Sequence, residues 1–242
     1  MSNNTKRLDY VLVHLGLGSR KSIKKLIKNS EVIVNNIRVT DSSTHIKLDD
    51  KIFIDGRQIH FKKYYYYMMN KPSGVISATY DKRQKTIIDL LLDIDKNKNL
   101  FPVGRLDKDT EGLILLTTNG KLTYNLISPD KNKLKTYIVE IDQEINNNDL
   151  DNIQNGVILE NGYKTLPCKV ELIDNNPKLI KISITEGKFH QIKRMFLSIG
   201  KNVIYLKRIS IDTLILDENL KVGEYRELTT DEIYELLRSN DI

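Results

Sequence analysis

The sequence predicts an α+β protein with a small N-terminal α/β domain and a larger domain built on a mainly antiparallel mixed sheet. Its 242 residues exceed the roughly 100 to 150 of a typical single domain, so a medium domain plus a small one is expected. The first 60 residues combine two short helical patterns with short alternating strands. Beyond them, hairpins dominate a mixed set of strands and helices, which indicates an antiparallel sheet.

The N-terminal domain is expected to span residues 6–60. Apolar residues at helical spacing open it, and a glycine-containing break precedes Ser19, which can cap a second helix. One face of this second helix is apolar and the other is basic. The basic residues are Arg20, Lys21, Lys24, Lys25 and Lys28. Two hairpins follow, with turns at Asn35-Asn36 and at Asp55-Gly56.

The larger domain is expected to span residues 64–240, after a linker at 61–63. Its first half is expected to hold a strand at 64–69, a helix capped by Thr86 and running to Leu92, an apolar strand at 113–116 and a helix capped by Asn119. Its second half is expected to hold a helix from Leu150 to Asn155, a hairpin joining 157–159 to a strand around 169–173, a strand at 179–184, a helix from about 189 to 199, a strand near 203–206 and a last helix with a capping box of Thr229 and Glu232.

Charge and composition favour a polyanionic partner and a cytoplasmic protein. The net charge of +6 suits binding to phosphates, because lysine and arginine that neutralise phosphates release condensed counterions. No apolar run approaches the ~20 residues needed to cross a bilayer, so no membrane association is expected. Cys168 is the only cysteine, which excludes disulfide frameworks and cysteine-rich zinc sites. Of the histidines, only His190 lies in a motif, and His14, His45 and His60 show no metal-ligand spacing, so no metal is expected.

A charged loop bounded by glycines lies directly before the apolar strand at 113–116. It reads Gly104-Arg105-Leu106-Asp107-Lys108-Asp109-Thr110-Glu111-Gly112. Its acidic spacing begins like a calcium-binding loop, but the twelfth position is Thr118 where a glutamate is required, which excludes a calcium site. The remaining interpretations are a rigidly held functional loop and a solvated turn whose carboxylates pair with Arg105 and Lys108.

A second polar cluster occurs at the start of the helix expected at 189–199. Its members are Lys188, His190, Gln191, Lys193 and Arg194. Donors gathered at a helix N-terminus suit a phosphate backbone or a buried carboxylate partner. This cluster favours the functional interpretation of the charged loop over the solvated turn.

These segments resemble the signature regions of a known enzyme family. The loop at 104–113, the motif Lys135-Thr136-Tyr137 and the segment 186–195 are similar to the three signature regions of bacterial ribosomal RNA pseudouridine synthases, and 70–74 resembles a further family segment. The N-terminal domain resembles the RNA-binding module of small-subunit ribosomal protein four. The Asp-x-Asp-Thr-x-Gly loop and the Lys-Thr-Tyr motif are most similar to the small-subunit (16S) pseudouridine synthase A type.

The resemblance implies an RNA pseudouridine synthase that acts on ribosomal RNA as a monomer and needs no cofactor. Its substrate would be 16S rRNA, naked or in a partly assembled small subunit. The family assigns the essential carboxylate to the position of Asp107, and the chemistry leaves open whether this group is a nucleophile or a base. The same reaction on 23S rRNA is an alternative. A non-catalytic RNA-binding ribosome assembly factor is another, which loss of the aspartate would have indicated.

The resemblance also assigns roles to other residues. Lys193 matches the basic partner that keeps the aspartate ionised, and Tyr137 matches the tyrosine that stacks on the target base, although a core strand tyrosine is the alternative. Arg105 matches the residue that fills the gap left by the flipped uridine, the alternative being an ion pair with Asp109 or Glu111. Further RNA-binding residues are expected to be Arg20, Lys21, Lys24, Lys25, Lys188, His190, Gln191 and Arg194.

Overall fold

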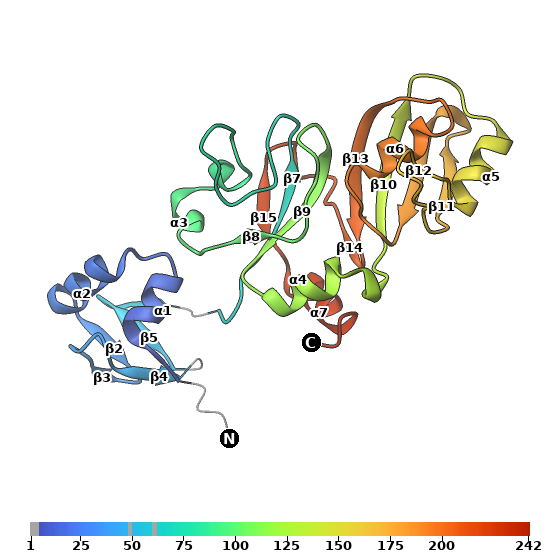
Figure 1. Ribbon diagram of the computed structural model, residues 1–242. Coiled ribbons are helices and arrows are strands. Elements are labelled where there is room, and N and C mark those ends of the chain that lie inside the picture. The colour runs from blue at the N-terminus through green and yellow to red at the C-terminus, as the bar shows by residue number, and fades with distance from the viewer. Residues whose placement is uncertain (1–4, 48–49, 60–61) are drawn as a thin grey trace. The chain divides into compact units, whose positions relative to one another are not determined.

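The computed structural model describes residues 5–47, 50–59 and 62–242 (Figure 1). The chain divides by its internal contacts into two compact units. The smaller unit comprises residues up to Tyr65 together with Ile88–Phe101, and the larger comprises Tyr66–Ile87 and Pro102–Ile242. No helix among the described residues is long and apolar enough to cross a bilayer.

The smaller unit combines short helices with short strands. Its elements are β1 (Thr5–Arg7), α1 (Leu8–His14), α2 (Arg20–Asn29), β2 (Val32–Val34), β3 (Ile37–Arg38), β4 (His45–Lys47), β5 (Ile52–Ile54), β6 (Arg57–Ile59), the 3-10 turn η1 (Ile88–Leu90) and α3 (Asp93–Lys96). Strands in the order β3-β2-β5-β6 form an antiparallel sheet, and β1 pairs with β4. The predicted cap of α2 is confirmed, because the backbone N–H of Ser22 donates to Oγ of Ser19 at 3.2 Å.

The segment Ile88–Phe101 belongs to the smaller unit, whereas we predicted an uninterrupted larger domain at 64–240. The backbone of Gly16 (φ +78°) lies so close to α3 that a Cβ there would be 2.6 Å from the carbonyl oxygen of Ile94. The Nζ of Lys98 also lies 4.8 Å from the ring centroid of Tyr65. Residues 60 and 61, which carry the predicted domain end and part of the 61–63 linker, lie outside the described residues.

The helix predicted from Thr86 to Leu92 is wrong. Thr86 forms a parallel bridge with Ile76, and the backbone N–H of Ile87 donates to the carbonyl of Ile76 at 3.1 Å. Because these bonds hold the backbone extended, only the short turn η1 follows. The polar segment after it forms the single-turn helix α3.

The larger unit is organised around one mixed sheet. Its elements are β7 (Tyr66–Lys71), β8 (Phe101–Pro102, at the boundary of the units), β9 (Glu111–Thr117), α4 (Gly120–Ile127), the 3-10 turn η2 (Pro129–Lys131), β10 (Lys135–Ile141), α5 (Asn147–Asn155), β11 (Lys169–Ile173), β12 (Asn176–Ile184), α6 (Gln191–Leu197), β13 (Val203–Ile211), β14 (Leu214–Ile215), β15 (Tyr225–Glu227) and α7 (Thr230–Arg238). The strand order is β11-β12-β10-β13-β9-β7-β15, and β14 pairs with β13. Figure 1 shows α5 and α6 beside the half with β10–β13, and α4 and α7 beside the half with β7, β9 and β15.

One parallel contact joins the two halves of this sheet. Strand β9 pairs with β13 in parallel through Glu111 with Lys207 and Gly112 with Arg208, whereas the neighbouring pairs along the sheet are antiparallel. A Cβ on Gly112 (φ +97°) would lie 2.2 Å from the carbonyl oxygen of Arg208. Glycine is therefore required for this approach. The predicted α+β class with a mainly antiparallel mixed sheet is confirmed.

The predicted pairing of 157–159 with the strand around 169–173 is wrong. Residues 157–159 instead close a local turn, in which Ile158 bridges Lys164 and the N–H of Leu159 donates to the carbonyl of Tyr163 at 2.9 Å. Strand β11 pairs with β12, because a second turn at Asp174-Asn175 with left-handed backbone joins those two strands directly. The predicted caps of α4 by Asn119 and of α7 by Thr229 and Glu232 are confirmed.

We predict that Gly112→Ala lowers the free energy of unfolding far more than Gly200→Ala. Both glycines have positive φ, so alanine costs about 1–2 kcal/mol of backbone strain at each. A Cβ on Gly112 would also meet backbone atoms of Arg208, whereas a Cβ on Gly200 has no heavy atom within 4 Å among the described residues. The loss in free energy of unfolding should therefore be larger for Gly112→Ala than for Gly200→Ala by at least about 2 kcal/mol. Urea unfolding of the two variants measures the difference, and equal losses would contradict the close approach of β9 and β13.

Candidate active site

The loop before β9 that carries Asp107 is anchored from below by a buried lysine. Lys71, at the end of β7, is fully buried, and its Nζ donates to the carbonyls of Pro72 at 2.9 Å, Lys108 at 3.2 Å and Thr110 at 2.8 Å. Two of these carbonyls flank the loop's acidic residues. Burial lowers the pKa of Lys71 to about 8, although nearby carboxylates oppose the shift. A charged donor with three acceptors thus fixes the path of the loop.

A buried hydroxyl fixes the same loop one residue before Asp107. The Oγ of Ser77 donates to the carbonyl of Leu106 at 2.9 Å and accepts from its N–H at 3.0 Å. The backbone N–H of Gly74 also donates to the carbonyl of Lys108 at 2.8 Å. The segment after β7 therefore holds the loop on both sides of Asp107 and fixes the position of its carboxylate.

Asp107 faces two basic side chains from α6 and the residue before it. The Nζ of Lys193 lies 3.2 Å from Oδ2 of Asp107, and Nε2 of His190 lies 3.6 Å from Oδ1. Lys193 also pairs with Asp109 at 2.5 Å. The hydrogen bond from Lys193 holds the pKa of Asp109 below its usual range. Since the side chain of Asp107 is 26% exposed, a carboxylate with a close cation remains accessible to a substrate.

Helix α6 begins in an unusual backbone conformation that sets these positions. His190 precedes the helix with φ +48°, in the left-handed region, and its ring stacks on that of Phe189 with centroids 3.8 Å apart. The apolar side of α6 is buried through Ile192, Met195 and Phe196. Packing of this face against the sheet directs Lys193 toward the Asp107 loop.

A buried carboxylate organises the segment that leads into α6. Glu186 is 6% exposed, and its oxygens accept from the hydroxyl of Tyr163 at 2.6 Å, the amide of Gln191 at 2.6 Å and the backbone N–H of Leu166 at 2.8 Å. Oε1 of Gln191 accepts from the backbone N–H of Lys188 at 2.8 Å. This network fixes the 186–191 segment beside the loop.

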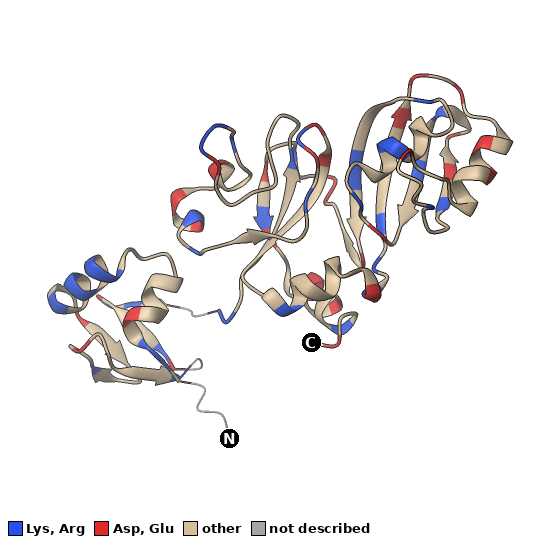
Figure 2. Ribbon diagram, viewed as in Figure 1, with Lys and Arg blue, Asp and Glu red and all other residues tan. Residues whose placement is uncertain are grey.

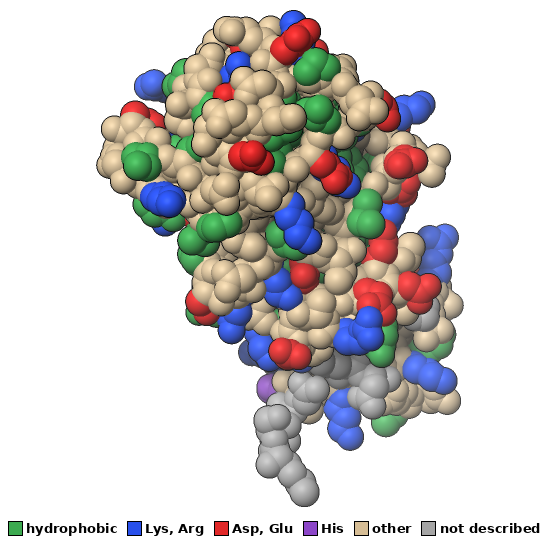
Figure 3. Space-filling view, turned by 90° about the vertical axis from the view of Figure 1, so that its right-hand side faces the viewer, with side chains coloured by type: hydrophobic (Ala, Val, Ile, Leu, Met, Phe, Trp, Pro, Cys, Tyr) green, Lys and Arg blue, Asp and Glu red, His purple; other side chains and the backbone are tan. Residues whose placement is uncertain are grey.

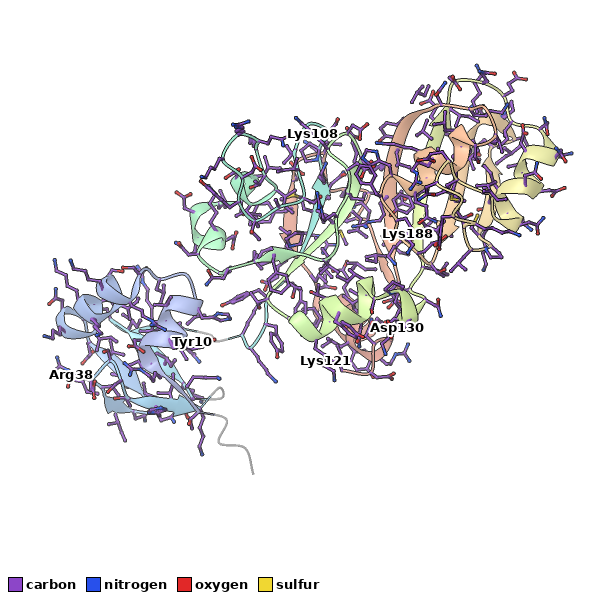
Figure 4. The ribbon with its side chains drawn as sticks, viewed as in Figure 1. Tyr10, Arg38, Lys108, Lys121, Asp130 and Lys188 are labelled. Atoms are coloured by element: carbon purple, nitrogen blue, oxygen red, sulfur yellow. The ribbon has the colours of Figure 1, made fainter. Side chains whose placement is uncertain are left out.

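A pocket forms where the loop, β10 and the 186–191 segment meet. Its lining includes Asp107, Tyr137, His190, Lys188 and Arg105. Tyr137 lies on β10 and is 8% exposed, so its ring forms part of the pocket wall. Figure 4 labels Lys108 in the Asp107 loop and Lys188 in the segment before α6. Two of the predicted catalytic residues, Asp107 and Tyr137, therefore line the same pocket. The third, Lys193, contacts Asp107 through its Nζ at 3.2 Å.

The predicted RNA-binding residues of this unit fall into two groups. Arg105 and Lys188 are exposed at the pocket, and Arg105 has no ion pair within 4 Å among the described residues, in contrast to the alternative of a pair with Asp109 or Glu111. Arg194 instead pairs with Glu160 at 2.7 Å and does not line the pocket. Gln191 is 4% exposed and uses its amide within the Glu186 network.

The predicted basic face of α2 is exposed in the smaller unit (Figure 2). Arg20 and Lys24 line a hollow with Lys6, Arg7 and Tyr10, and Lys24 and Lys25 line a second one. Lys21 is exposed but lines neither hollow. Tyr10 on α1 is labelled in Figure 4, and the Nζ of Lys6 lies 5.8 Å from its ring centroid.

Several residues that build the site were not assigned a role from the sequence. These are Lys71, Ser77, Glu186 and Tyr163. Lys71 lies within the family-like 70–74 segment, and its position before Pro72 at a strand end was the available signal. Among the described residues, no group of three or more His, Cys, Asp or Glu side chains could hold a metal ion.

Comparison with known proteins places these features in a family. A model described as RNA pseudouridylate synthase matches residues 65–198, and one described as S4 domain matches residues 6–52. The chain is 43% identical over 231 residues to the uncharacterized RNA pseudouridine synthase YtzG of Bacillus subtilis, covering 94% of this chain and 97% of that protein. The chain belongs to the RNA pseudouridylate synthase family.

Further relatives of this synthase carry names for both ribosomal subunits. Ribosomal large subunit pseudouridine synthase B of Bacillus subtilis is 36% identical, with coverage of 96% of this chain and 95% of that protein. Ribosomal small subunit pseudouridine synthase A of Haemophilus influenzae is 34% identical, with 96% and 100% coverage. A crystal structure of a pseudouridylate synthase matches with a TM-score of 0.67 and 33% identity, covering 95% of this chain and 99% of that one. The predictions of a pseudouridine synthase fold, an S4-like module and this enzyme class are confirmed.

We predict that the stability of the wild type relative to a Lys71→Met variant depends on pH, because the cost of burying the charge of Lys71 is relieved as this lysine loses its proton. An unfolded lysine has a pKa of about 10.4, whereas burial lowers the pKa of Lys71 in the folded enzyme to about 8. Between these values the unfolded state binds more protons, so the free energy of unfolding of the wild type should rise relative to the variant as pH increases from about 8 to about 10.

Urea unfolding of both proteins across this pH range measures the effect. Lys181→Met is the control, because Lys181 is part-exposed and paired with Glu171 at 2.9 Å, so that its loss removes no buried charge. A difference in free energy of unfolding between the wild type and Lys71→Met that does not change with pH would contradict the burial of a charged amine beneath the loop.

Proposed function

We propose that this synthase converts one uridine of ribosomal RNA to pseudouridine with Asp107 as its catalytic carboxylate, and that the substrate is 16S rRNA, naked or in a partly assembled small subunit. The observation that carries this proposal is the placement of Asp107 in a pocket with Tyr137 and beside Lys193. The reaction breaks the N1–C1′ bond and forms a C5–C1′ bond, while C5 loses a proton and N1 gains one. It is an isomerisation, and the protein carries it out as a monomer.

Lys193 is the electrostatic partner of Asp107 in this proposal. Its Nζ lies 3.2 Å from Oδ2 of Asp107 and holds a positive charge beside the carboxylate. The charged carboxylate can attack C1′ as a nucleophile or take a proton from the ribose to start elimination of the base. Both routes require the same charge on Asp107, so Lys193 serves either one.

Tyr137 and Arg105 support the flipping of the target uridine into the pocket. The ring of Tyr137 forms a wall on which a uracil can stack, which is worth about 1–3 kcal/mol per base. Flipping costs a few kcal/mol of lost stacking in the RNA. Arg105 is exposed at the same pocket without an ion pair among the described residues, so it is available to fill the gap in the RNA stack.

The basic face of α2 supports positioning of the RNA by the smaller unit. Helix α2 carries no acidic residue, and its Arg20, Lys21, Lys24 and Lys25 side chains are exposed. By contrast, acidic and basic side chains are interspersed on the face of the molecule shown in Figure 3. A one-sign cluster contacts phosphates without reading base sequence.

The choice of 16S rRNA rests on the Asp-x-Asp-Thr-x-Gly form of the loop and on the Lys-Thr-Tyr motif. The comparable identity of a relative named for the large subunit, at 36%, favours 23S rRNA as the second candidate substrate. The two candidates share the chemistry and differ in the RNA helix that is recognised.

We predict that Asp107→Asn removes pseudouridine formation, with a loss of at least about a thousandfold, because the amide can neither attack C1′ nor accept a proton. Asp109→Asn is the matched control, since it removes an equal charge two residues away and leaves Asp107 paired with Lys193. Carbodiimide labelling and primer extension on 16S and 23S transcripts and on partly assembled small subunits measure the product.

A single 16S position modified by the wild type and by Asp109→Asn, but not by Asp107→Asn, would support the whole proposal. A position in 23S rRNA would keep the chemistry and replace the substrate. Modification by Asp107→Asn at the wild-type rate would contradict the assigned carboxylate. Salt-sensitive RNA binding without product in any of these RNAs would favour the non-catalytic assembly factor.

We predict that replacing Arg20, Lys21, Lys24 and Lys25 with alanine weakens RNA binding without slowing catalysis at saturating RNA. The slope of log affinity against log salt should become shallower by about 0.7–0.9 for each phosphate that the variant no longer neutralises. Arg38→Ala with Arg57→Ala is the control, because these exposed side chains lie on strands of the same unit and line neither hollow beside α2. Arg38 is labelled in Figure 4. Filter binding over a salt series tests the difference, and an unchanged slope would show that α2 is a solvated lysine face.

A further inference from the structure

A second pocket adjoins the Asp107 pocket and has a different character. The two pockets share Arg105, Tyr137, Gly187 and Lys188 as lining residues. The second one is further lined by Lys135 at the start of β10 and by Arg208 on β13, both of which are less than a tenth exposed. Its charged lining consists of Arg105, Lys135, Lys188 and Arg208 against a single acid, Glu186.

The two buried cations of this pocket lack an anionic partner. Neither Lys135 nor Arg208 has a carboxylate within 4 Å in the described part of the chain. Nζ of Lys135 donates to the carbonyls of Lys133 at 2.9 Å and Thr185 at 3.2 Å, and Nε of Arg208 donates to the carbonyl of Leu113 at 2.8 Å. Nη2 of Arg208 is buried without a hydrogen-bond partner among the described residues. An unpaired donor on a buried charge is costly, so the protein itself leaves the charge of Arg208 incompletely compensated.

The two cations also repel each other. Burial lowers the pKa of Lys135 to about 8, and the charge of Arg208 acts in the same direction. Asp212 opposes this effect, but its carboxylate is already bonded to Lys133, Ser239 and Asn240. Two like charges held close together at low exposure are stabilised by an anion between them.

The only acid of the lining is occupied elsewhere. The oxygens of Glu186 accept from Tyr163, Gln191 and the N–H of Leu166. Glu186 is not among the groups that shift the pKa of Lys135, whereas Arg208 and Asp212 are. Its oxygens are therefore engaged by three neutral donors away from Lys135 and Arg208, and the lining keeps four basic side chains against one acid.

We infer that this second pocket binds a phosphodiester group of the substrate RNA, one next to the nucleotide whose uridine enters the Asp107 pocket. This inference rests on the proposed function. Every nucleotide in a strand has a phosphate on each side of its ribose, so a ribose at Asp107 brings a phosphate to the wall formed by Tyr137 and Lys188. Lys135 and Arg208 supply the charge-assisted donors that a phosphate accepts.

The test is a chemical double-mutant cycle between Lys135 and single linkages of the RNA. The RNA is the fragment that contains the modified uridine, made as a series in which one phosphodiester at a time is an uncharged methylphosphonate. The proteins are the wild type, Lys135→Met and Lys181→Met, the last being a surface lysine that lines neither pocket. Affinity is measured by fluorescence anisotropy, and pseudouridine formation is measured in the same samples.

The wild type should bind one RNA of the series, in which the uncharged linkage lies beside the target uridine, about tenfold more weakly than the natural RNA. Lys135→Met should bind the natural RNA about tenfold more weakly than the wild type does, and its slope of log affinity against log salt should be shallower by about 0.7. Removing the charge of that linkage should not weaken its binding further. Lys181→Met should respond like the wild type. Methionine removes the repulsion with Arg208 but also two hydrogen bonds to backbone carbonyls. The unfolding temperature of Lys135→Met is therefore measured as well, and a value close to that of the wild type separates lost binding from lost structure.

Equal sensitivity of the wild type and Lys135→Met at every linkage would overturn the inference. If Lys135→Met does not fold, the wild-type series decides alone, and equal losses at all linkages overturn it. Inorganic phosphate that raises the unfolding temperature of the wild type but not of Lys135→Met, without coupling to any linkage, would assign the pocket to a free phosphate and likewise overturn the RNA assignment. Absence of pseudouridine from the natural fragment would contradict the proposed function, whereas product without coupling contradicts only the phosphate site.

Discussion

The parallel pairing of β9 with β13 is the contact on which the site depends. It joins a half-sheet that carries the Asp107 loop to a half-sheet that carries Tyr137 and leads into α6. Only Gly112 allows the strands to approach this closely, because a Cβ there would overlap the carbonyl of Arg208. The Nε of Arg208 then bonds across to the carbonyl of Leu113. Asp107 and the residues that surround it come from opposite sides of this one junction.

Buried lysines give the site its rigidity at a cost in stability. Lys71 satisfies three carbonyls under the loop, and Lys135 satisfies two at the base of the second pocket. In both cases burial disfavours the charge, as the lowered pKa values show. A hydrophobic residue of similar volume avoids this desolvation but leaves backbone carbonyls without donors. Charged donors at these positions therefore lower the free energy of unfolding but hold the loop and the pocket in a fixed geometry.

The sequence predicted local features of the fold well, and long-range ones less well. Caps at Ser19, Asn119 and Thr229 depend on residues within one helical turn, and the structure confirms them. The helix predicted after Thr86 does not form, because Thr86 bridges Ile76, ten residues earlier in the chain. A helical pattern in the sequence contains no information about that contact. The wrong partner predicted for β11 has the same cause. A turn lies on each side of this strand, so the local sequence allows either neighbour as its partner, and only the folded sheet shows that it pairs with β12.

The site shows the same division between local and distant information. Asp107 and Lys193 could be named because each lies in a motif of contiguous residues, and the structure brings them within 3.2 Å. Ser77 could not be named, since its role depends on Leu106, 29 residues away. Glu186 lies inside a family-like segment, but its function is defined by Tyr163 and Gln191 together. Such networks are a property of the folded chain, and no single segment contains them.

Basic residues in this enzyme separate into paired and unpaired groups, and the two groups contribute differently. Lys193 already shares its single charge between the carboxylates of Asp107 and Asp109, so it should add little to the release of counterions when RNA binds. The exposed cations of α2 and Arg105 have no ion pair within 4 Å among the described residues, so under the proposed function they are available to neutralise phosphates, which then release their counterions. The salt dependence of RNA binding should therefore arise from the unpaired cations, which include the exposed set and those of the second pocket, and not from Lys193, which is paired with Asp107. Under the proposed function, substrate capture and chemistry therefore depend on different charges of the same molecule.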